Sequence, residues 1–209
     1  MMKRISHLAL PLPLLLLLCG FFWSNPTWEQ VNATINRKYP SVKNIDITNL
    51  KTFLDQGKLF VLIDVREKEE FAVSHLPTAV NIQKSAAVHY PKDTPIVVYC
   101  SVGVRSADFA VKLGDLGFTS ILNLRGSIFA WGNKSYPLVR GNTAVSVVHP
   151  YNKKWGKLLN RELHMYSTPS EESTKKRLRT VFERKLVRIF VKHIGSRIIA
   201  ELKIDFFLS

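Results

Sequence analysis

Short apolar runs alternate with helix-spaced apolar stripes in the middle of the chain. Runs of this kind are typical of strands buried on both faces of a sheet, and stripes are typical of helices that cover such a sheet. The strands are expected at 59–63, 79–82, 96–99 and 120–124. The helices are expected around 50–54, over 66–74 at the surface, over 107–116 and from 128 onward. The pattern predicts an α/β domain over 46–140, with a parallel-stranded sheet flanked by helices.

The start of the chain has a different pattern. Lys3 and Arg4 precede an apolar stretch over 5–23, which is about long enough to span a bilayer. We therefore expect 1–23 to be a signal peptide or, preferably, an uncleaved membrane anchor, with the rest of the protein exported. The location would be periplasmic, or membrane-anchored and facing outside the cytoplasm. Residues 24–45 would be a linker that leads into the domain.

The end of the chain is basic. Residues 141–165 contain two large aromatic side chains in a short stretch, and we expect them to form an extension that packs on the domain. Residues 166–209 are expected to be a basic amphipathic tail suited to an anionic membrane surface or to a partner groove. A solvated terminal helix with no such role is an equal alternative. The apolar positions behind this helix prediction recur every four residues: Leu178, Phe182, Leu186, Phe190, Ile194, Ile198 and Leu202.

Net charge differs between the middle of the chain and its ends. The chain has 209 residues and a net charge of +14, from 30 Lys and Arg against 16 Asp and Glu. Residues 46–140 contribute only +2, so the excess belongs to the flanking segments. A nucleic-acid-binding domain would carry a basic patch on the folded module itself. We therefore expect no nucleic-acid partner, and a membrane contact through the N-terminal segment.

The candidate chemistry lies after the strand expected at 96–99. This strand runs directly into Cys100, and a helix follows the short loop that contains Gly103 and Arg105. Backbone N–H groups of such a loop, together with the helix N-terminus, favour a thiolate, which is the nucleophilic form of cysteine. A buried, inert cysteine is the alternative reading of Cys100 taken alone. With only 2 Cys in the chain, a disulfide framework and a four-cysteine metal site are excluded.

An ordered set of motifs resembles the rhodanese-like family of single-domain sulfurtransferases. The resemblance covers about 46–140 and rests on the whole ordered set of motifs rather than on the active-site loop alone. The matching stretches are Leu62-Ile63-Asp64-Val65-Arg66-Glu67, Glu70-Phe71, Ser74-His75-Leu76-Pro77-Thr78-Ala79, Val98-Tyr99-Cys100-Ser101-Val102-Gly103-Val104-Arg105-Ser106, Gly117-Phe118, Leu124-Arg125-Gly126-Ser127 and Ala130-Trp131.

The resemblance implies that Cys100 takes a sulfane sulfur from a donor, becomes a persulfide and passes the sulfur to a thiophilic acceptor. It also implies that Asp64 and Arg66 support the loop structurally and that His75 belongs to a turn rather than to the catalytic set. No cofactor and no metal are expected. The residues implied for the loop that cradles the substrate are Ser101, Val102, Gly103, Val104 and Arg105.

Two details of the motifs bear on activity. Related phosphatases have a loop one residue longer, so the six-residue loop here indicates a sulfurtransferase. Ser74, Thr78 and Ser127 stand where the family usually has Gly, which puts local turn geometry in doubt. The donor is expected to be a small sulfur-containing anion such as thiosulfate, or a low-molecular or protein persulfide. The alternative function is a non-catalytic or sensory binding module at the membrane.

Overall fold

The computed structural model describes residues 25–81, 90–183 and 185. The chain divides into two compact units, Met1–Tyr166 and Ser167–Ser209. The apolar stretch expected to be a signal peptide or anchor, 1–23, lies outside the described residues. Across the part of the chain that is described, no helix is both long and apolar enough to cross a membrane.

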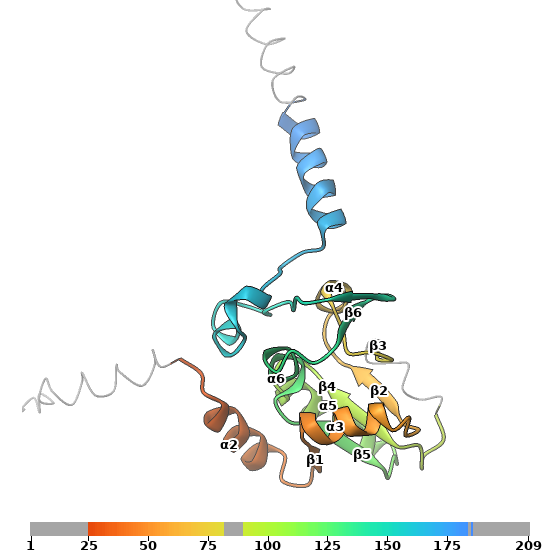
Figure 1. Ribbon diagram of the computed structural model, residues 1–209. Coiled ribbons are helices and arrows are strands. Elements are labelled where there is room, and N and C mark those ends of the chain that lie inside the picture. Colours follow the sequence, from red (N-terminus) through yellow and green to blue (C-terminus); the bar gives the residue numbers. More distant parts are fainter. Residues whose placement is uncertain (1–24, 82–89, 184, 186–209) are drawn as a thin grey trace, which may run out of the picture. The chain divides into compact units, whose positions relative to one another are not determined.

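A five-stranded parallel sheet forms the centre of the first unit (Figure 1). Its strand order is β1-β5-β4-β2-β3, and each neighbouring pair is parallel. The expected parallel α/β fold is therefore confirmed, with β4 in the middle of the sheet. The strands are β1 (Asn44–Ile45), β2 (Val61–Asp64), β3 (Val80–Asn81), β4 (Ile96–Tyr99) and β5 (Ile121–Leu124).

Alternating side chains of the strands build two cores, one on each face of the sheet. Ile63 and Val98 pack with Leu113 of the helix α5 (Val104–Asp115). Leu62 and Val97 belong to the core that contains the helices α3 (Ile47–Asp55) and α6 (Ser127–Asn133). Because strand side chains point alternately to opposite faces, continuous apolar strands need helices on both sides. Figure 1 shows this layered arrangement.

The segment expected as a linker, 24–45, contains the helix α2 (Trp28–Lys38) and the edge strand β1. Thr27 caps α2, because its side chain accepts from the backbone N–H of Gln30 while the Gln30 side chain accepts from Thr27. Val31 and Ile35 are buried from this helix and join the domain core. The lead-in is thus part of the folded unit.

A hairpin and the extension that follows it complete the first unit. β6 (Leu138–Arg140) pairs antiparallel with β7 (Thr143–Val145), and Val139 also bridges to His75 beyond the short helix α4 (Lys68–Val73). The extension continues through two 3-10 turns, η2 (Trp155–Leu158) and η3 (Arg161–Leu163). Leu158 of η2 and Leu159, which follows it, are buried and belong to the core of the domain.

The second unit begins at Ser167. Its described part is a helix over 169–183, on which Leu178, Val181 and Phe182 are exposed. The positions beyond 185 on which the amphipathic pattern depends lie outside the described residues.

Candidate functional site

The Cys100 loop lies at the carboxyl end of β4. Cys100 is buried with 1% of its surface exposed, and its Sγ accepts a hydrogen bond from the backbone N–H of Gly103 at 3.1 Å. Gly103 has φ +105°, and a Cβ there would lie 3.2 Å from Ile35 Cδ1. The loop therefore requires glycine at this position, both for its backbone conformation and for space. The sulfur sits just before the N-terminus of the twelve-residue helix α5, which stabilises negative charge.

The start of α6 fixes the backbone of the same loop. Ser127 Oγ accepts from the N–H of Cys100 at 3.1 Å and donates to the carbonyl of Leu124 at 3.0 Å. The N–H groups of Ile128 and Phe129 donate to the carbonyls of Cys100 and Ser101. These bonds satisfy polar groups of a fully buried segment, so the position of the thiol is set by two helices rather than one.

Two of the three substituted turn positions adopt the left-handed conformation that favours glycine. Thr78 has φ +65° and Ser127 has φ +49°. Ser74 differs, because its backbone is extended. The backbone therefore keeps a glycine-type conformation at Thr78 and Ser127 despite their side chains, and Ser127 uses its hydroxyl to hold Cys100.

Arg105 is bound by a buried carboxylate. Its guanidinium donates to both oxygens of Glu70, at 2.8 and 2.9 Å, and to Ser101 Oγ at 2.9 Å. Burial would raise the pKa of Glu70, but the hydrogen bonds and charge of Arg105 outweigh burial and lower it. The polar pattern over 66–74 predicts a surface helix and no role for Glu70. Glu70 is in fact only 3% exposed, so this residue of the site was missed.

Asp64 and Arg66 form a buried ion pair beside the loop. Arg66 Nη2 lies 2.6 Å from Asp64 Oδ2 and also donates to the carbonyl of Ser74 at 2.6 Å. The charge and hydrogen bonds of Asp64 raise the pKa of Arg66 although burial alone would lower it. The pair ties the end of β2 to the turn after α4.

His75 packs into the same region. Its ring stacks on Phe71 with centroids 4.0 Å apart, and its Nδ1 lies 3.0 Å from the carbonyl oxygen of Leu76. The backbone of His75 exchanges hydrogen bonds with Val139 of β6. Through these contacts, the ring and the backbone of His75 connect α4 to the hairpin β6-β7.

Part of the extension lies against the Cys100 loop. The Tyr151 ring centroid is 4.5 Å from Arg105 Cζ, and Tyr151 is 43% exposed. The backbone N–H of Tyr151 donates to His149 Nδ1, and burial lowers the pKa of His149. The aromatic residues of 141–165 predict packing on the domain but give no sign that one of them lies beside the Cys100 loop.

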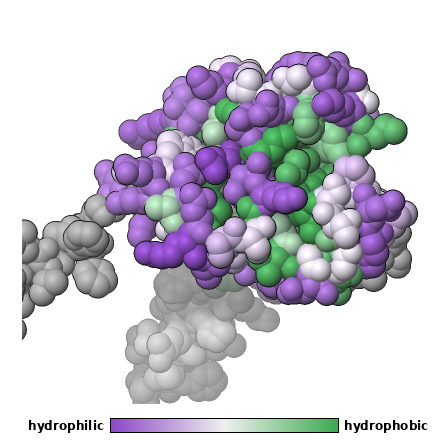
Figure 2. All heavy atoms as spheres, turned by 90° about the horizontal axis from the view of Figure 1, so that it is seen from below, coloured by the Kyte–Doolittle hydropathy of each residue, from purple (hydrophilic) through white to green (hydrophobic). Residues whose placement is uncertain are grey.

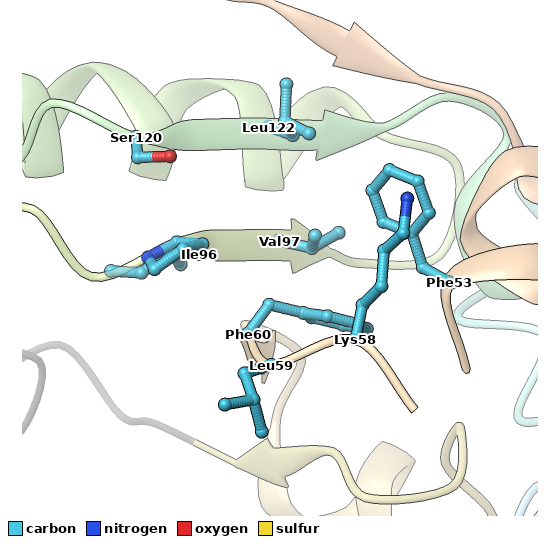
Figure 3. A pocket seen from close by; sticks show the side chains of 9 residues that line it. Phe53, Lys58, Leu59, Phe60, Ile96, Val97, Ser120 and Leu122 are labelled. Atoms are coloured by element: carbon cyan, nitrogen blue, oxygen red, sulfur yellow. The ribbon is translucent and has the colours of Figure 1, made fainter. Parts of the chain in front are cut away.

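The described residues contain no group of three or more His, Cys, Asp and Glu that could hold a metal ion. A separate pocket of about 190 Å³ lies at the amino ends of the strands (Figure 3). Phe53 and Phe60 lie within it with their ring centroids 6.3 Å apart, and Lys58 Nζ lies 4.0 Å from the Phe53 centroid. Its lining is mostly apolar and contains no cysteine.

Comparison with known proteins gives a family match. The model for the rhodanese-like domain matches residues 46–134. A sulfurtransferase from Allochromatium vinosum is 32% identical over 102 residues, which cover 47% of this chain and 95% of that protein. A probable adenylyltransferase/sulfurtransferase, MoeZ, from Mycobacterium tuberculosis is 35% identical over 94 residues, which cover 42% of this chain but only 24% of MoeZ. This chain thus spans about a quarter of the length of MoeZ.

A solved structure also resembles part of the chain. The rhodanese-related protein from Thermoplasma volcanium is 26% identical, with a TM-score of 0.43, and the match covers 47% of this chain and 98% of that one.

Proposed function

Because this chain belongs to the rhodanese-like domain family, we propose that it is a sulfurtransferase that moves a sulfane sulfur through a persulfide on Cys100. The observation that carries the proposal is the hydrogen bond from the Gly103 N–H to Cys100 Sγ, in a loop that ends at the N-terminus of α5. Backbone donors and a helix terminus stabilise the anionic sulfur of both the thiolate and its persulfide. The same environment serves each step of a sulfur relay.

The reaction has two displacements. The Cys100 thiolate attacks the sulfane sulfur of the donor, so an S–S bond forms to Cys100 and the bond between the sulfane sulfur and the rest of the donor breaks. The electron pair of the broken bond leaves with sulfite or with an organic thiolate. A thiophilic acceptor then attacks the outer sulfur of the persulfide, and the electron pair of the S–S bond returns to Cys100 as thiolate. No external oxidant or reductant is required.

We propose a persulfide, low-molecular or protein-bound, as the donor in preference to thiosulfate. Thiosulfate is a dianion and would be favoured by fixed positive charge that has no carboxylate partner. Arg105 is the only cation of the six-residue loop, and Glu70 binds it through two hydrogen bonds. The pair has no net charge, which reduces the attraction for a dianion.

A non-catalytic binding or sensory module is the second candidate. The observation that favours it is the 1% exposure of Cys100, because a nucleophile must meet its donor. A docking unit would keep the fold and the two ion pairs but would show a thiol that does not react with sulfane donors.

Thiocyanate formation from a sulfane donor and cyanide distinguishes these candidates. The full-length protein should form thiocyanate, and Cys100→Ser should reduce turnover by at least about a thousandfold, since the thiolate is the attacking group. Cys19→Ser is the matched control, because it removes the only other cysteine, and it should retain turnover. Turnover that survives in Cys100→Ser would contradict the proposal.

We also propose that the apolar segment over 5–23 holds the domain at a membrane, outside the cytoplasm. Its length and the preceding Lys3 and Arg4 support this location. Fractionation of a tagged full-length protein should leave it with membranes after an alkaline wash. Recovery in the cytoplasmic fraction would contradict the location without bearing on the sulfur chemistry.

A further inference from the structure

An aromatic side chain from outside the matched region lies beside the Cys100 loop. The family model ends at residue 134, whereas Tyr151 lies 4.5 Å from Arg105 Cζ, measured to its ring centroid. Arg105 ends the loop that Cys100 begins, and its guanidinium donates to the Oγ of Ser101, the neighbour of Cys100 in the chain, at 2.9 Å. A residue of the extension therefore borders the site through a side chain of the loop.

Tyr151 is held in place by its own turn. Its φ of +60° lies in the left-handed region, which is unfavourable for a residue with a β-carbon. The turn is fixed by hydrogen bonds from the Tyr151 N–H to His149 Nδ1 at 3.1 Å and from the Asn152 N–H to the Pro150 carbonyl at 2.7 Å. Asn152 Oδ1 then accepts from the N–H groups of Lys154 and Trp155, which start the first 3-10 turn. These hydrogen bonds hold the backbone that carries the Tyr151 ring in a defined conformation.

The Tyr151 ring is partly open to solvent although Arg105, on which it lies, belongs to the loop of a buried cysteine. Tyr151 is 43% exposed and Tyr166 is 54% exposed, and the ring of His149 packs edge-on against Tyr166 with centroids 5.6 Å apart. The two terminal nitrogens of Arg105 donate to Glu70 and Ser101. Beside the loop, an incoming molecule can therefore meet the exposed Tyr151 ring, and the charge of Arg105 is already paired with Glu70.

We propose that Tyr151 is a specificity-determining residue, a platform on which the organic part of a persulfide donor packs while its sulfane sulfur reaches Cys100. This inference rests on the proposed function and deepens it. An inorganic donor has no carbon skeleton to pack on the ring, so it gains nothing from the platform. An organic persulfide buries apolar surface there, which favours its binding.

The test compares two donors on the full-length protein. The measured quantity is the rate at which Cys100 gains one sulfur, followed by mass spectrometry of its peptide at several concentrations of glutathione persulfide or thiosulfate. Tyr151→Ala should lower the ratio of second-order rates, persulfide over thiosulfate, by about tenfold, as is usual when one apolar contact is lost. The loss should appear as a higher half-saturating concentration of the persulfide.

Two variants make the result specific. Tyr151→Phe keeps the ring and should stay within about twofold of the wild-type ratio. Leu116→Ala removes an exposed apolar side chain just after the far end of α5 and should leave the ratio unchanged.

Three results would overturn the inference. An equal loss with both donors would show that Tyr151 only supports Arg105, and an unaltered ratio with intact loading would show that it does not select donors. Failure of the wild type to load sulfur from either donor would overturn the proposed function together with this inference.

Discussion

The two ends of the parallel sheet differ in what they offer chemically. At the carboxyl ends of the strands, backbone N–H groups, a thiol, one fully buried ion pair and one partly buried ion pair meet in closely packed structure. At the amino ends, a pocket of about 190 Å³ is lined mainly by apolar side chains (Figure 3). The pocket at the amino ends thus has no cysteine in its lining, and the cysteine at the carboxyl ends is almost fully covered.

The difference shows where an α/β domain places its chemistry. Helices that follow parallel strands begin at the carboxyl edge, so their N-terminal N–H groups converge there and nowhere else on the sheet. Figure 2 shows hydrophobic side chains gathered among hydrophilic ones on the face seen from below, which is an ordinary feature of protein surfaces. In this fold, the direction of the strands therefore indicates the position of the candidate functional site better than a pocket or an apolar surface patch does.

The largest effect is expected from breaking the buried pair at the carboxyl edge. Asp64→Asn leaves Arg66 without its partner in a fully buried position and should lower the free energy of unfolding by about 3–5 kcal/mol. Urea denaturation measures the change. The control is Asp55→Asn, which breaks an exposed pair with Lys51 on α3 and should cost at most about 1 kcal/mol. Equal costs for the two variants would contradict the contrast in burial.

A smaller effect is expected from Glu70→Gln, which leaves Arg105 without its carboxylate. Because Arg105 is partly exposed, the loss of unfolding free energy should be about 1–2 kcal/mol. The pKa of Glu70 is lowered from 4.5, so its stabilising contribution is complete above that pH and is lost as the pH falls through the lowered pKa. The variant should lack this acid-dependent loss. The uncompensated Arg105 should also increase the rate with thiosulfate relative to a persulfide.

Thermal unfolding of the wild type and Glu70→Gln at several pH values between 3 and 7 measures the acid dependence, in the range where carboxylates titrate (about 3–5). If the melting temperatures of the two proteins fell in parallel as the pH was lowered, Glu70 would not be the cause of the loss of stability in acid. An unchanged donor ratio in Glu70→Gln would contradict the proposed reason for donor preference.

Ser127→Gly should separate reactivity from stability. The variant loses the acceptor for the Cys100 N–H but relieves a positive φ, so its unfolding free energy should change by less than about 1 kcal/mol. The loss of this anchor should slow sulfur loading of Cys100 about threefold, because one hydrogen bond positions the loop. Thr78→Gly relieves a similar φ without touching the loop and should load at the wild-type rate. Slower loading in both variants would indicate a general loosening instead.

The smallest effect is expected at the amino edge. Leu59 lines the pocket there and is 92% exposed, so Leu59→Ser should change the unfolding free energy by no more than about 0.5 kcal/mol. Sulfur loading of Cys100 should be unaffected. A clear loss of loading in this variant would mean that the two ends of the sheet are coupled, contrary to the separation described above.

The elements that could be predicted from the sequence are those whose side chains are buried in the same way along the whole element. The central strands are buried on both faces, so their apolar runs are continuous and the position of Cys100 at the end of β4 follows from them. The helix α2 and the hairpin β6-β7 were not predicted. α2 is anchored by only two buried side chains, Val31 and Ile35, within an otherwise polar stretch, so its pattern is weak.

The network around the thiol was only partly predictable. Glu70 lies on a helix whose charged residues indicate a surface position, and its burial arises because Arg105 and Ser101 reach it from another element. The same holds for Tyr151, which borders the site only through the fold of the extension. Thr78 and Ser127 were recognisable as unusual in sequence, but the bond from the Cys100 N–H to Ser127 Oγ required the structure.

Mass spectrometry of the Cys100 peptide tests the central claim most directly. After incubation of the full-length protein with a sulfane donor, this peptide should gain about 32 Da, the mass of one sulfur on the thiolate, and should lose it again when cyanide is added. The Cys19 peptide serves as the internal control and should remain unmodified. A Cys100 peptide that gains no sulfur from thiosulfate or from a persulfide would contradict the proposal that this domain transfers sulfur.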